Sequence, residues 1–297
     1  MACLLMVSCN KEGQFNPKSK IDKIYYSCND KYDEVNDYGD WETVDEGVLP
    51  KYVCEIWNWD GNVLKSISHY DYDGEFDYSE TFVYEGKSLV SIVTGVAERW
   101  TLNYEKGKLS LMEYYSDNER LYSYEFTHDK GKISEIIVTS FGSKKSVMTK
   151  FPVSVLRFFI PAANTEALIK AIAKINEKNT TKEVYTYNIK LEWSGKNVSK
   201  ATYIDGAYTN TYEYTYDEKM NPYYGLFDLE RFDFEDLLSK NNITRCVKRD
   251  FDDYYECNYI YTYKGKVPTM QTYTNTDYNY SLGYRYTVTN NYYFEYK

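Results

Sequence analysis

This chain has few histidines and few basic residues relative to its acidic ones. Its 297 residues include only two histidines, His69 and His128, which leaves little material for a histidine metal site or a catalytic triad. Lys and Arg together number 35 and Asp and Glu number 45, so the formal net charge is −10. A chain with this balance has no basic footprint for a phosphate backbone. We therefore expect no nucleic-acid partner and no metal centre.

Long apolar runs and catalytic motifs are missing as well. No stretch approaches about 18 apolar residues, so the sequence predicts no membrane-spanning helix. No Cys-x-x-Cys pair occurs, which disfavours thioredoxin-like chemistry and zinc ribbons. The acidic groups at 71–77 and 250–253 lack the spacing of a calcium-binding EF-hand loop, and we interpret both as solvated turns. We expect no cofactor and no catalytic residue; a hydrolase whose carboxylates no motif marks stays as an alternative.

Aromatic residues are abundant. The chain has 36 Tyr, 13 Phe and 5 Trp, so tyrosine alone is as frequent as all basic residues together. Disordered chains have few aromatics, and coiled coils are built from Ala, Leu, Glu and Lys in heptads. The composition therefore predicts a folded chain that is rich in β-strands.

One short unit recurs along the sequence. It reads aromatic, any residue, aromatic, then in most copies an acid, a turn with glycine, and an apolar residue, which is how a strand enters a tight hairpin with Gly supplying a positive φ. Its first four glycines are spaced 25, 21 and 24 residues apart. A degenerate copy without glycine occupies 214–222. The six glycines are Gly61, Gly86, Gly107, Gly131, Gly195 and Gly265.

A second set of turns lies midway between these glycines, at 71–74, 95–97, 116–118 and 204–206. Each period thus divides into two strands and two turns, which predicts a long antiparallel meander of roughly fourteen to sixteen strands. Because the array is interrupted twice, we expect an all-β fold with one or two helices. The predicted architecture is an open curved sheet or incomplete barrel with a helix packed on one face.

Alternation within the strands indicates which residues share a face. In 121–128 and 212–217 the aromatic side chains fall on every second position and polar residues fall between them. One sheet face is therefore aromatic and the other is wet. Cross-strand aromatic pairs stabilise a sheet by about 0.2 to 1 kcal/mol each, so we interpret most tyrosines as structural.

Two insertions interrupt the meander, at about 152–180 and 222–243. In the first, 164–178 carries apolar residues at helical spacing behind an N-cap at Asn164 or Thr165, and we expect this helix to cover the aromatic face. A helix that binds a partner is the alternative. The second insertion has a possible short helix near 235–238. No linker rich in Pro, Gly or Ser divides the rest, so 21–297 is predicted to be a single domain.

The amino terminus resembles the end of a bacterial lipoprotein signal. Residues 1–9 are a short apolar run that ends in Ser8 and Cys9 and is followed by polar sequence. The resemblance implies that Cys9 is lipidated and becomes the first mature residue, with 10–20 as a tether. Only eight residues precede Cys9, and none is Lys or Arg, unlike a complete export signal. An ordinary buried strand or a disordered end is the alternative. Residues 10–12 resemble the export signal of surface lipoproteins of Bacteroidetes.

Four further cysteines form an even set that allows three disulfide pairings. Cys246 and Cys257 lie symmetrically about 251–252, so a hairpin that turns there sets them opposite each other. Cys28 with Cys54 is the complementary pair. Free buried thiols are the alternative.

The repeat unit resembles the YD repeat of Rhs proteins, whose long antiparallel sheets wrap into shells. The segments 214–217, 221–226 and 238–244 resemble uncharacterised surface lipoproteins of Bacteroidetes with such repeats. The repeat-like portion covers about 50–140 and 185–290. The resemblance to these two groups implies no catalytic motif in this chain.

We therefore predict a lipid-anchored protein of the bacterial outer membrane, exposed at the surface, of non-catalytic binding or scaffold type. It would contact the membrane through its anchor only, and its partner would be a protein or a glycan. In the first alternative, exposed aromatic rings form a glycan platform at Trp57, Trp59 and Trp100. In the second, the protein is a hydrolase with unmarked carboxylates.

Overall fold

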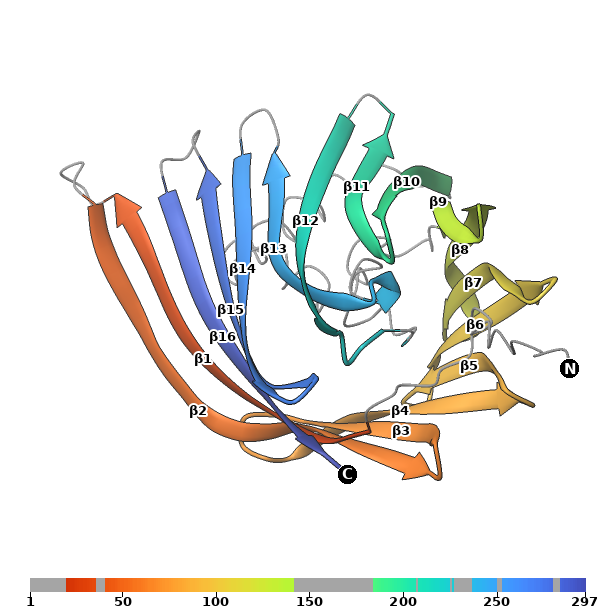
Figure 1. Ribbon diagram of the computed structural model, residues 1–297, viewed down its shortest axis with the longest axis horizontal. Coiled ribbons are helices and arrows are strands. Elements are labelled where there is room, and N and C mark those ends of the chain that lie inside the picture. Colours follow the sequence, from red (N-terminus) through yellow and green to blue (C-terminus); the bar gives the residue numbers. More distant parts are fainter. Residues whose placement is uncertain are drawn as a thin grey trace, which may run out of the picture.

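The computed structural model describes residues 20–35, 41–141, 184–206, 208–224, 226, 237–249, 253–279 and 284–297. Sixteen antiparallel strands form one closed barrel in this part of the chain (Figure 1). Each strand pairs with its neighbours in sequence, and β1 pairs with β16 to close the ring. The strands are β1 (Ile21–Val35), β2 (Trp41–Asp60), β3 (Val63–Tyr70), β4 (Phe76–Glu85), β5 (Ser88–Thr94), β6 (Glu98–Glu105), β7 (Lys108–Ser116), β8 (Glu119–Asp129), β9 (Lys132–Phe141), β10 (Val184–Ser194), β11 (Asn197–Asp205), β12 (Tyr208–Met220), β13 (Asn241–Arg249), β14 (Asp253–Lys264), β15 (Val267–Asn279) and β16 (Tyr284–Tyr296).

The expected open sheet or incomplete barrel is wrong, because the first and last strands pair over most of their length. Their register runs from Ile21 opposite Tyr296 to Asp33 opposite Arg285. Closure leaves no unpaired strand edge, which removes the site at which sheets aggregate. The predicted strand number is confirmed at its upper limit.

The expected helix on one sheet face is also wrong for this architecture. The aromatic face lines the inside of the closed barrel, so the wall itself encloses the surface that the helix was to cover. Every named element in the described ranges is a strand. The predicted helix at 164–178 lies outside the described residues. Of the second insertion the structure describes 222–224, 226 and 237–243, with helical backbone at Leu237 and Leu238 and strand β13 from Asn241.

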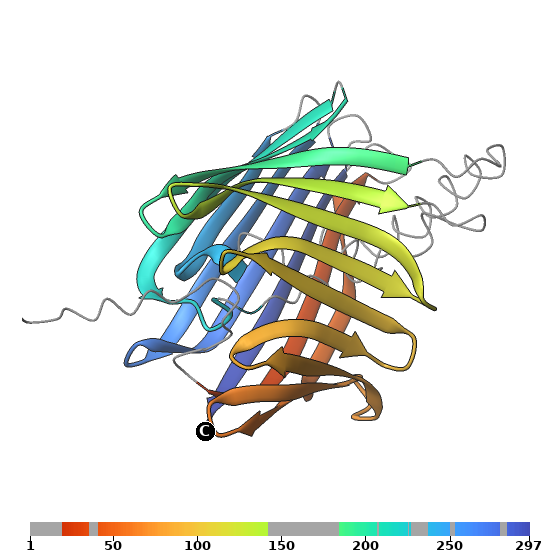
Figure 2. The ribbon, with the colours of Figure 1, turned by 90° about the vertical axis from the view of Figure 1, so that its right-hand side faces the viewer.

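The repeat glycines lie in turns, as predicted. All six have φ between 57° and 82°, the left-handed region that Gly enters without a steric penalty. These turns lie at one end of the barrel, on the left of Figure 2, and we call this end the repeat-turn end. The chain enters the barrel at the same end, because Lys20 Nζ donates to the carbonyl of Gly61. Lys297 N donates to the carbonyl of Lys20 at 2.9 Å.

Each repeat unit also carries a β-bulge beside its turn. In the β8–β9 hairpin, Thr127 pairs with Glu135 and His128 pairs with Ile133, so Ser134 is the extra residue. The Ser134 hydroxyl donates to the carbonyl of Thr127 at 3.2 Å. The same hydroxyl contact occurs in three further hairpins, from Ser110 to Asn103, Ser199 to Glu192 and Thr269 to Thr262, at 3.1 to 3.2 Å. Bulges increase local twist and curve a sheet, which helps a meander to close.

The second aromatic residue of the unit connects neighbouring strands through its polar tip. Tyr104 OH donates to the carbonyl of Leu89 at 2.7 Å, one residue before the bulge in that hairpin. Equivalent bonds run from Trp59 to Ile21, Trp193 to Ile133, Tyr216 to Val198 and Tyr296 to Pro268, at 2.5 to 2.8 Å. A buried aromatic residue with a polar tip usually finds such a partner. The repeat therefore selects Tyr and Trp for hydrogen bonding as well as for packing.

An apolar core fills the inside of the barrel at the repeat-turn end. Its fully buried side chains include Leu64, Ile67, Leu89, Leu109, Ile133 and Val198. The connection between β12 and β13 supplies Leu226, Leu237 and Leu238 to the same core. Tyr223, just after β12, meets the ring of Phe294 in β16 with centroids 6.0 Å apart. This connection thus reaches across the interior of the barrel.

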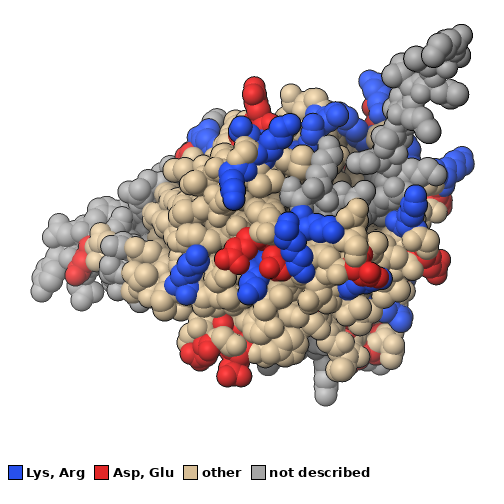
Figure 3. Space-filling model, turned by 60° about the horizontal axis from the view of Figure 1, so that its bottom comes forward, with Lys and Arg blue, Asp and Glu red and all other residues tan. Residues whose placement is uncertain are grey.

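The outer wall carries mainly hydroxyl, amide and charged side chains. On β14 to β16 the inward positions include Cys257, Tyr273 and Asn275, all buried. The alternate positions point outward and are Glu256, Asn258 and Ile260 on β14, Thr272, Thr274 and Thr276 on β15, and Thr287, Thr289 and Asn291 on β16. In Figure 3, charged side chains of both signs are spread over the face seen from below. Exposed apolar residues such as Val83 and Ile260 are scattered along the wall.

Candidate functional site

A polar group interrupts the apolar inner wall where β2, β3 and β4 meet. His69 Nε2 lies 3.1 Å from Glu80 Oε2, and the exposed fractions of these residues are 7% and 0%. Tyr78 stacks on the imidazole with ring centroids 4.3 Å apart. Glu55 lies opposite His69 in the strand register and accepts a hydrogen bond from Trp57 Nε1 at 2.7 Å. Two carboxylates and one imidazole are thus collected on the inside of the barrel.

This group combines the residue types of acid–base chemistry, but its His69–Glu80 pair is closed to solvent. The side chain of Glu80 is 1% exposed and that of His69 is 9% exposed. A general acid or base must come within hydrogen-bond reach of a substrate atom, and these two groups instead face each other. A buried charge also needs a partner, because desolvation without one is costly. We therefore interpret the pair as an internal hydrogen-bonded contact that fixes β3 against β4. No sequence motif marked these residues, because their association depends on strand register.

A second inner group surrounds two cysteines on β13 and β14. Cys246 lies directly opposite Cys257, as the hairpin symmetry predicted, and both are buried thiols in the structure. Cys257 Sγ lies 3.2 Å from Tyr273 OH, which is 3.1 Å from Tyr255 OH. Burial raises the pKa of both tyrosines well above the ordinary value, so both remain neutral hydroxyls.

The register separates the other two cysteines. Tyr26 pairs with Tyr52; Cys28 lies two residues further along β1, and Cys54 lies two residues beyond Tyr52 in the opposite direction. Four residues of strand span about 13 Å, well beyond the distance that a disulfide bridges. Cys54 Sγ instead donates to the carbonyl of Ile24 at 3.3 Å. Geometry therefore favours the Cys246–Cys257 pairing and disfavours Cys28 with Cys54.

The three tryptophans of the expected glycan platform face the interior. Trp57 is 1% exposed and Trp100 is 3% exposed, while Trp59 is partly buried against the same core. Trp57 and Trp59 stack with centroids 6.2 Å apart, and Trp100 packs on Tyr114 at 4.8 Å. An exposed platform built from these rings is wrong. Alternation alone could not indicate which face becomes the inside of a closed barrel.

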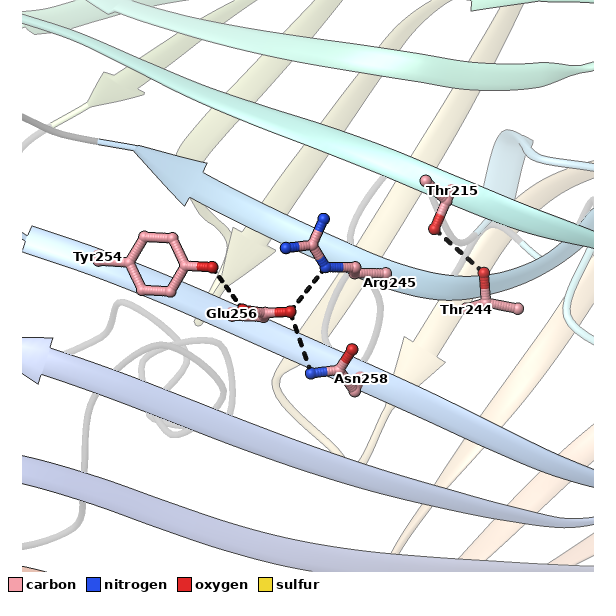
Figure 4. A network of polar contacts seen from close by, with 6 residues as sticks. All are labelled: Thr215, Thr244, Arg245, Tyr254, Glu256 and Asn258. Carbon is pink, nitrogen blue, oxygen red and sulfur yellow. Dashed lines mark hydrogen bonds and ion pairs between the residues drawn. The ribbon is translucent and has the colours of Figure 1, made fainter.

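A polar network on the outer wall connects β13 and β14 (Figure 4). Arg245 Nε donates to Glu256 Oε1 at 2.6 Å, and Asn258 Nδ2 donates to the same oxygen at 3.3 Å. The Tyr254 hydroxyl donates to the other carboxylate oxygen. The hydrogen bonds from Arg245 and then Tyr254 lower the pKa of Glu256 to about 2. The network lies flat on the sheet, and we interpret it as a cross-strand clamp.

Known proteins resemble this chain in structure but not detectably in sequence. No protein-family model matches the chain, and no curated protein matches it. Solved structures similar to it include two porin-like proteins. One is a porin-like protein from Bacteroides uniformis ATCC 8492, with 10% identity and a TM-score of 0.32, over 93% of this chain and 98% of that one. The other is a porin-like protein from Bacteroides vulgatus ATCC 8482, with 8% identity and a TM-score of 0.40, over 94% and 99%. Both TM-scores are below 0.5, so neither likeness supports a conclusion about this chain.

Two further observations apply to the described part of the chain. It contains no group of three or more His, Cys, Asp or Glu side chains placed to hold a metal ion. None of its helical residues belongs to a helix long and apolar enough to cross a membrane. The expected lipidation site, Cys9, lies outside the described residues.

Proposed function

We propose that this chain is a lipid-anchored, non-catalytic β-barrel protein of the bacterial cell envelope, which serves as a binding or scaffold protein. The observation that carries the proposal is the distribution of side chains between the two faces of the barrel wall. The inner face packs an apolar core, and the outer face presents threonine, asparagine and charged residues.

This distribution is the reverse of that in a barrel embedded in lipid. Such barrels carry an outward apolar band about 25 Å tall and enclose a polar interior. Here the outward positions of β15 include Thr272, Thr274 and Thr276 beside Met270, and Leu226 and Leu237 fill the interior at the repeat-turn end. Moving such hydroxyls from water into hydrocarbon costs about 1 to 3 kcal/mol for each one without a protein partner, whereas Thr272 keeps its hydrogen bond to Asn291. A wall that faces water requires a separate membrane anchor.

The amino-terminal sequence supplies a candidate anchor. Lipidation of Cys9 would attach the barrel through a tether at 10–20 and place it at the outer membrane. The charged residues at 10–12 support exposure at the cell surface.

The proposal that the protein is not an enzyme is supported by the side chains of the inner wall. Among the described residues, one inward pair combines an imidazole with a carboxylate, namely His69 and Glu80. This pair is closed to solvent. A protein or glycan partner would therefore bind an exposed surface rather than a reaction centre.

A glycan is the second candidate function, and a different set of rings favours it. Tyr185 and Tyr187 on β10 and Tyr203 and Tyr212 on β11 and β12 share the inner face towards the end opposite the repeat turns. Their ring pairs are 6.2 Å and 5.3 Å apart, and Tyr185 is 45% exposed. Replacing Tyr185 and Tyr187 with Ala should abolish binding to a glycan array that the wild-type protein recognises, and unchanged binding would remove this candidate.

Fractionation of cells tests the anchor. The chain is expressed behind a complete lipoprotein signal, with radiolabelled palmitate, as wild type, Cys9→Ala and the control Cys3→Ala. We expect wild type and Cys3→Ala to carry label and to sediment with the outer membrane, and Cys9→Ala to be unlabelled and soluble. Unlabelled wild type, or Cys9→Ala that stays in the membrane after a high-salt wash, contradicts the proposal.

A further inference from the structure

Charge is divided between the two ends of the barrel. The six repeat turns, each counted with one strand residue on either side, contain eight lysines and four acidic residues. The four described turns at the opposite end, counted in the same way, contain seven acidic residues and neither Lys nor Arg. The two long connections are outside this count. The segment 221–240, which joins β12 to β13, holds five acidic and two basic residues, and the segment 142–183, which joins β9 to β10, holds three acidic and eight basic residues. The positive charge of the repeat-turn end is therefore a property of its six tight turns.

The lysines form a rim at the repeat-turn end. Seven of the eight are exposed, and the eighth, Lys132, donates from Nζ to the carbonyl of Gly195 in the neighbouring turn. We call this set the lysine rim. Its members are Lys87, Lys106, Lys108, Lys130, Lys132, Lys196, Lys264 and Lys266.

The lysine rim surrounds the end at which the tethered segment enters the barrel. Lys20 is the first described residue, and its ammonium contacts the turn at Gly61. From Cys9 to Lys20 the chain has eleven steps, which span at most about 40 Å when fully extended. If Cys9 carries the lipid, the end of the barrel nearest the membrane is the repeat-turn end. This step rests on the proposed lipidation.

We infer that the lysine rim docks on anionic phospholipid head groups and sets the orientation of the barrel on its membrane. Lysine ammonium groups and lipid phosphates attract each other across a gap shorter than the Debye length, about 10 Å at 0.1 M salt. The acidic turns at the far end are repelled by the same surface. The barrel therefore stands with its acidic end away from the membrane and free for a partner.

Flotation with vesicles tests the docking without the lipid anchor. The full-length Cys9→Ala chain is mixed with vesicles of phosphatidylcholine, with or without phosphatidylglycerol. The rim variant also carries Lys87→Glu and Lys266→Glu, two exposed turn residues. The matched wall variant carries Lys51→Glu and Lys190→Glu, two exposed residues of the strands. Both variants change the net charge by the same amount, so only the position of the change differs.

We expect the parent chain to float with phosphatidylglycerol vesicles and not with pure phosphatidylcholine, and to be released by salt. Each lysine near an anionic surface strengthens binding about fivefold, so the rim variant should bind roughly 25-fold more weakly or worse, and the wall variant within a few-fold of the parent. An equal loss in both variants, or no preference for phosphatidylglycerol, overturns the inference. Thermal melting checks that both variants fold. Because Cys9 is absent throughout, this result is independent of whether Cys9 is lipidated in cells.

Discussion

Trp193 Nε1 donates to the carbonyl of Ile133 at 2.7 Å and so connects β10 to β9 next to a bulge. The same arrangement recurs at four further places around the barrel, where the second aromatic residue reaches a carbonyl beside a bulge. Tyr84, whose hydroxyl has no hydrogen-bond partner among the described residues, is an exception. Tyrosine is abundant in this chain partly because a phenol can fill that role from a buried position.

Removing one of these hydroxyls should cost stability in proportion to its hydrogen bond. Tyr104→Phe deletes the donor to Leu89 and leaves a buried carbonyl, so the free energy of unfolding should fall by about 1 kcal/mol. Tyr84 is the control, because its buried hydroxyl has no hydrogen-bond partner among the described residues. Tyr84→Phe should leave stability unchanged or raise it. Urea titration measures both, and equal losses would show that the hydrogen bond contributes nothing.

The β12–β13 connection should behave as part of the core. Leu226 and Leu237 are 0% and 1% exposed, and truncation of either to Ala should lower the free energy of unfolding by about 2 to 5 kcal/mol. Ile260→Ala on the outer wall, where the side chain is 70% exposed, should change it by less than about 0.5 kcal/mol. Equilibrium unfolding compares the three variants. A small effect at both leucines would mean that the connection does not fill the barrel.

Cys246 and Cys257 should form a disulfide in protein exported to an oxidising compartment. A directly opposed cross-strand pair has Cα atoms about 4.5 to 5.5 Å apart, within the range of disulfides. Two thiols lose two protons and two electrons to a disulfide oxidant, which is reduced to a dithiol. The bridge should add about 3 kcal/mol and raise Tm by about 6 to 12 °C.

Peptide mapping under non-reducing conditions identifies the pair directly. In the double variant Cys246→Ser and Cys257→Ser, a reductant should no longer change Tm. Cys28→Ser with Cys54→Ser should preserve it, because the register keeps those residues apart. Recovery of Cys246 and Cys257 as free thiols from exported protein would refute the pairing.

The Arg245–Glu256 contact should make stability depend on pH in the acid range. The pKa of Glu256 falls from 4.5 to about 2 on folding, so the contact stabilises the barrel fully above pH 4.5 and is lost between about pH 4.5 and pH 2. The carboxylate is partly exposed, and solvent screening limits the effect to about 1 kcal/mol. Glu256→Gln should flatten that part of a plot of Tm against pH, whereas Glu125→Gln, at an exposed position on β8, should not. Identical slopes for the two variants would show that the Arg245–Glu256 contact does not cause the pH dependence of Tm.

The sequence predicted the local parts of this fold and missed the parts that depend on distant residues. Gly131 and its equivalents marked their turns, because a positive φ is a local demand that glycine meets best. The opposition of Cys246 and Cys257 followed from the symmetry of one hairpin. Pairing of β1 with β16 joins residues at the two ends of the chain, and no local pattern encodes it.

Closure also explains the errors about the candidate site. A strand with alternating residues has two faces, and only the closed barrel makes one of them inaccessible, which is why Trp57 and Trp100 are core residues. The contact between His69 and Glu80 depends on the register of β3 against β4, and bulges shift that register. The lysines of the repeat turns were visible in the sequence, but their common position at one end required the topology.

The central claim is that the barrel wall faces water, so that the barrel itself does not enter the lipid. The most direct test is the behaviour of the unlipidated Cys9→Ala chain without detergent. We predict a soluble, monodisperse protein with strand-rich circular dichroism and a cooperative thermal transition. A protein that aggregates without detergent, and folds only in micelles or bilayers, would contradict the account.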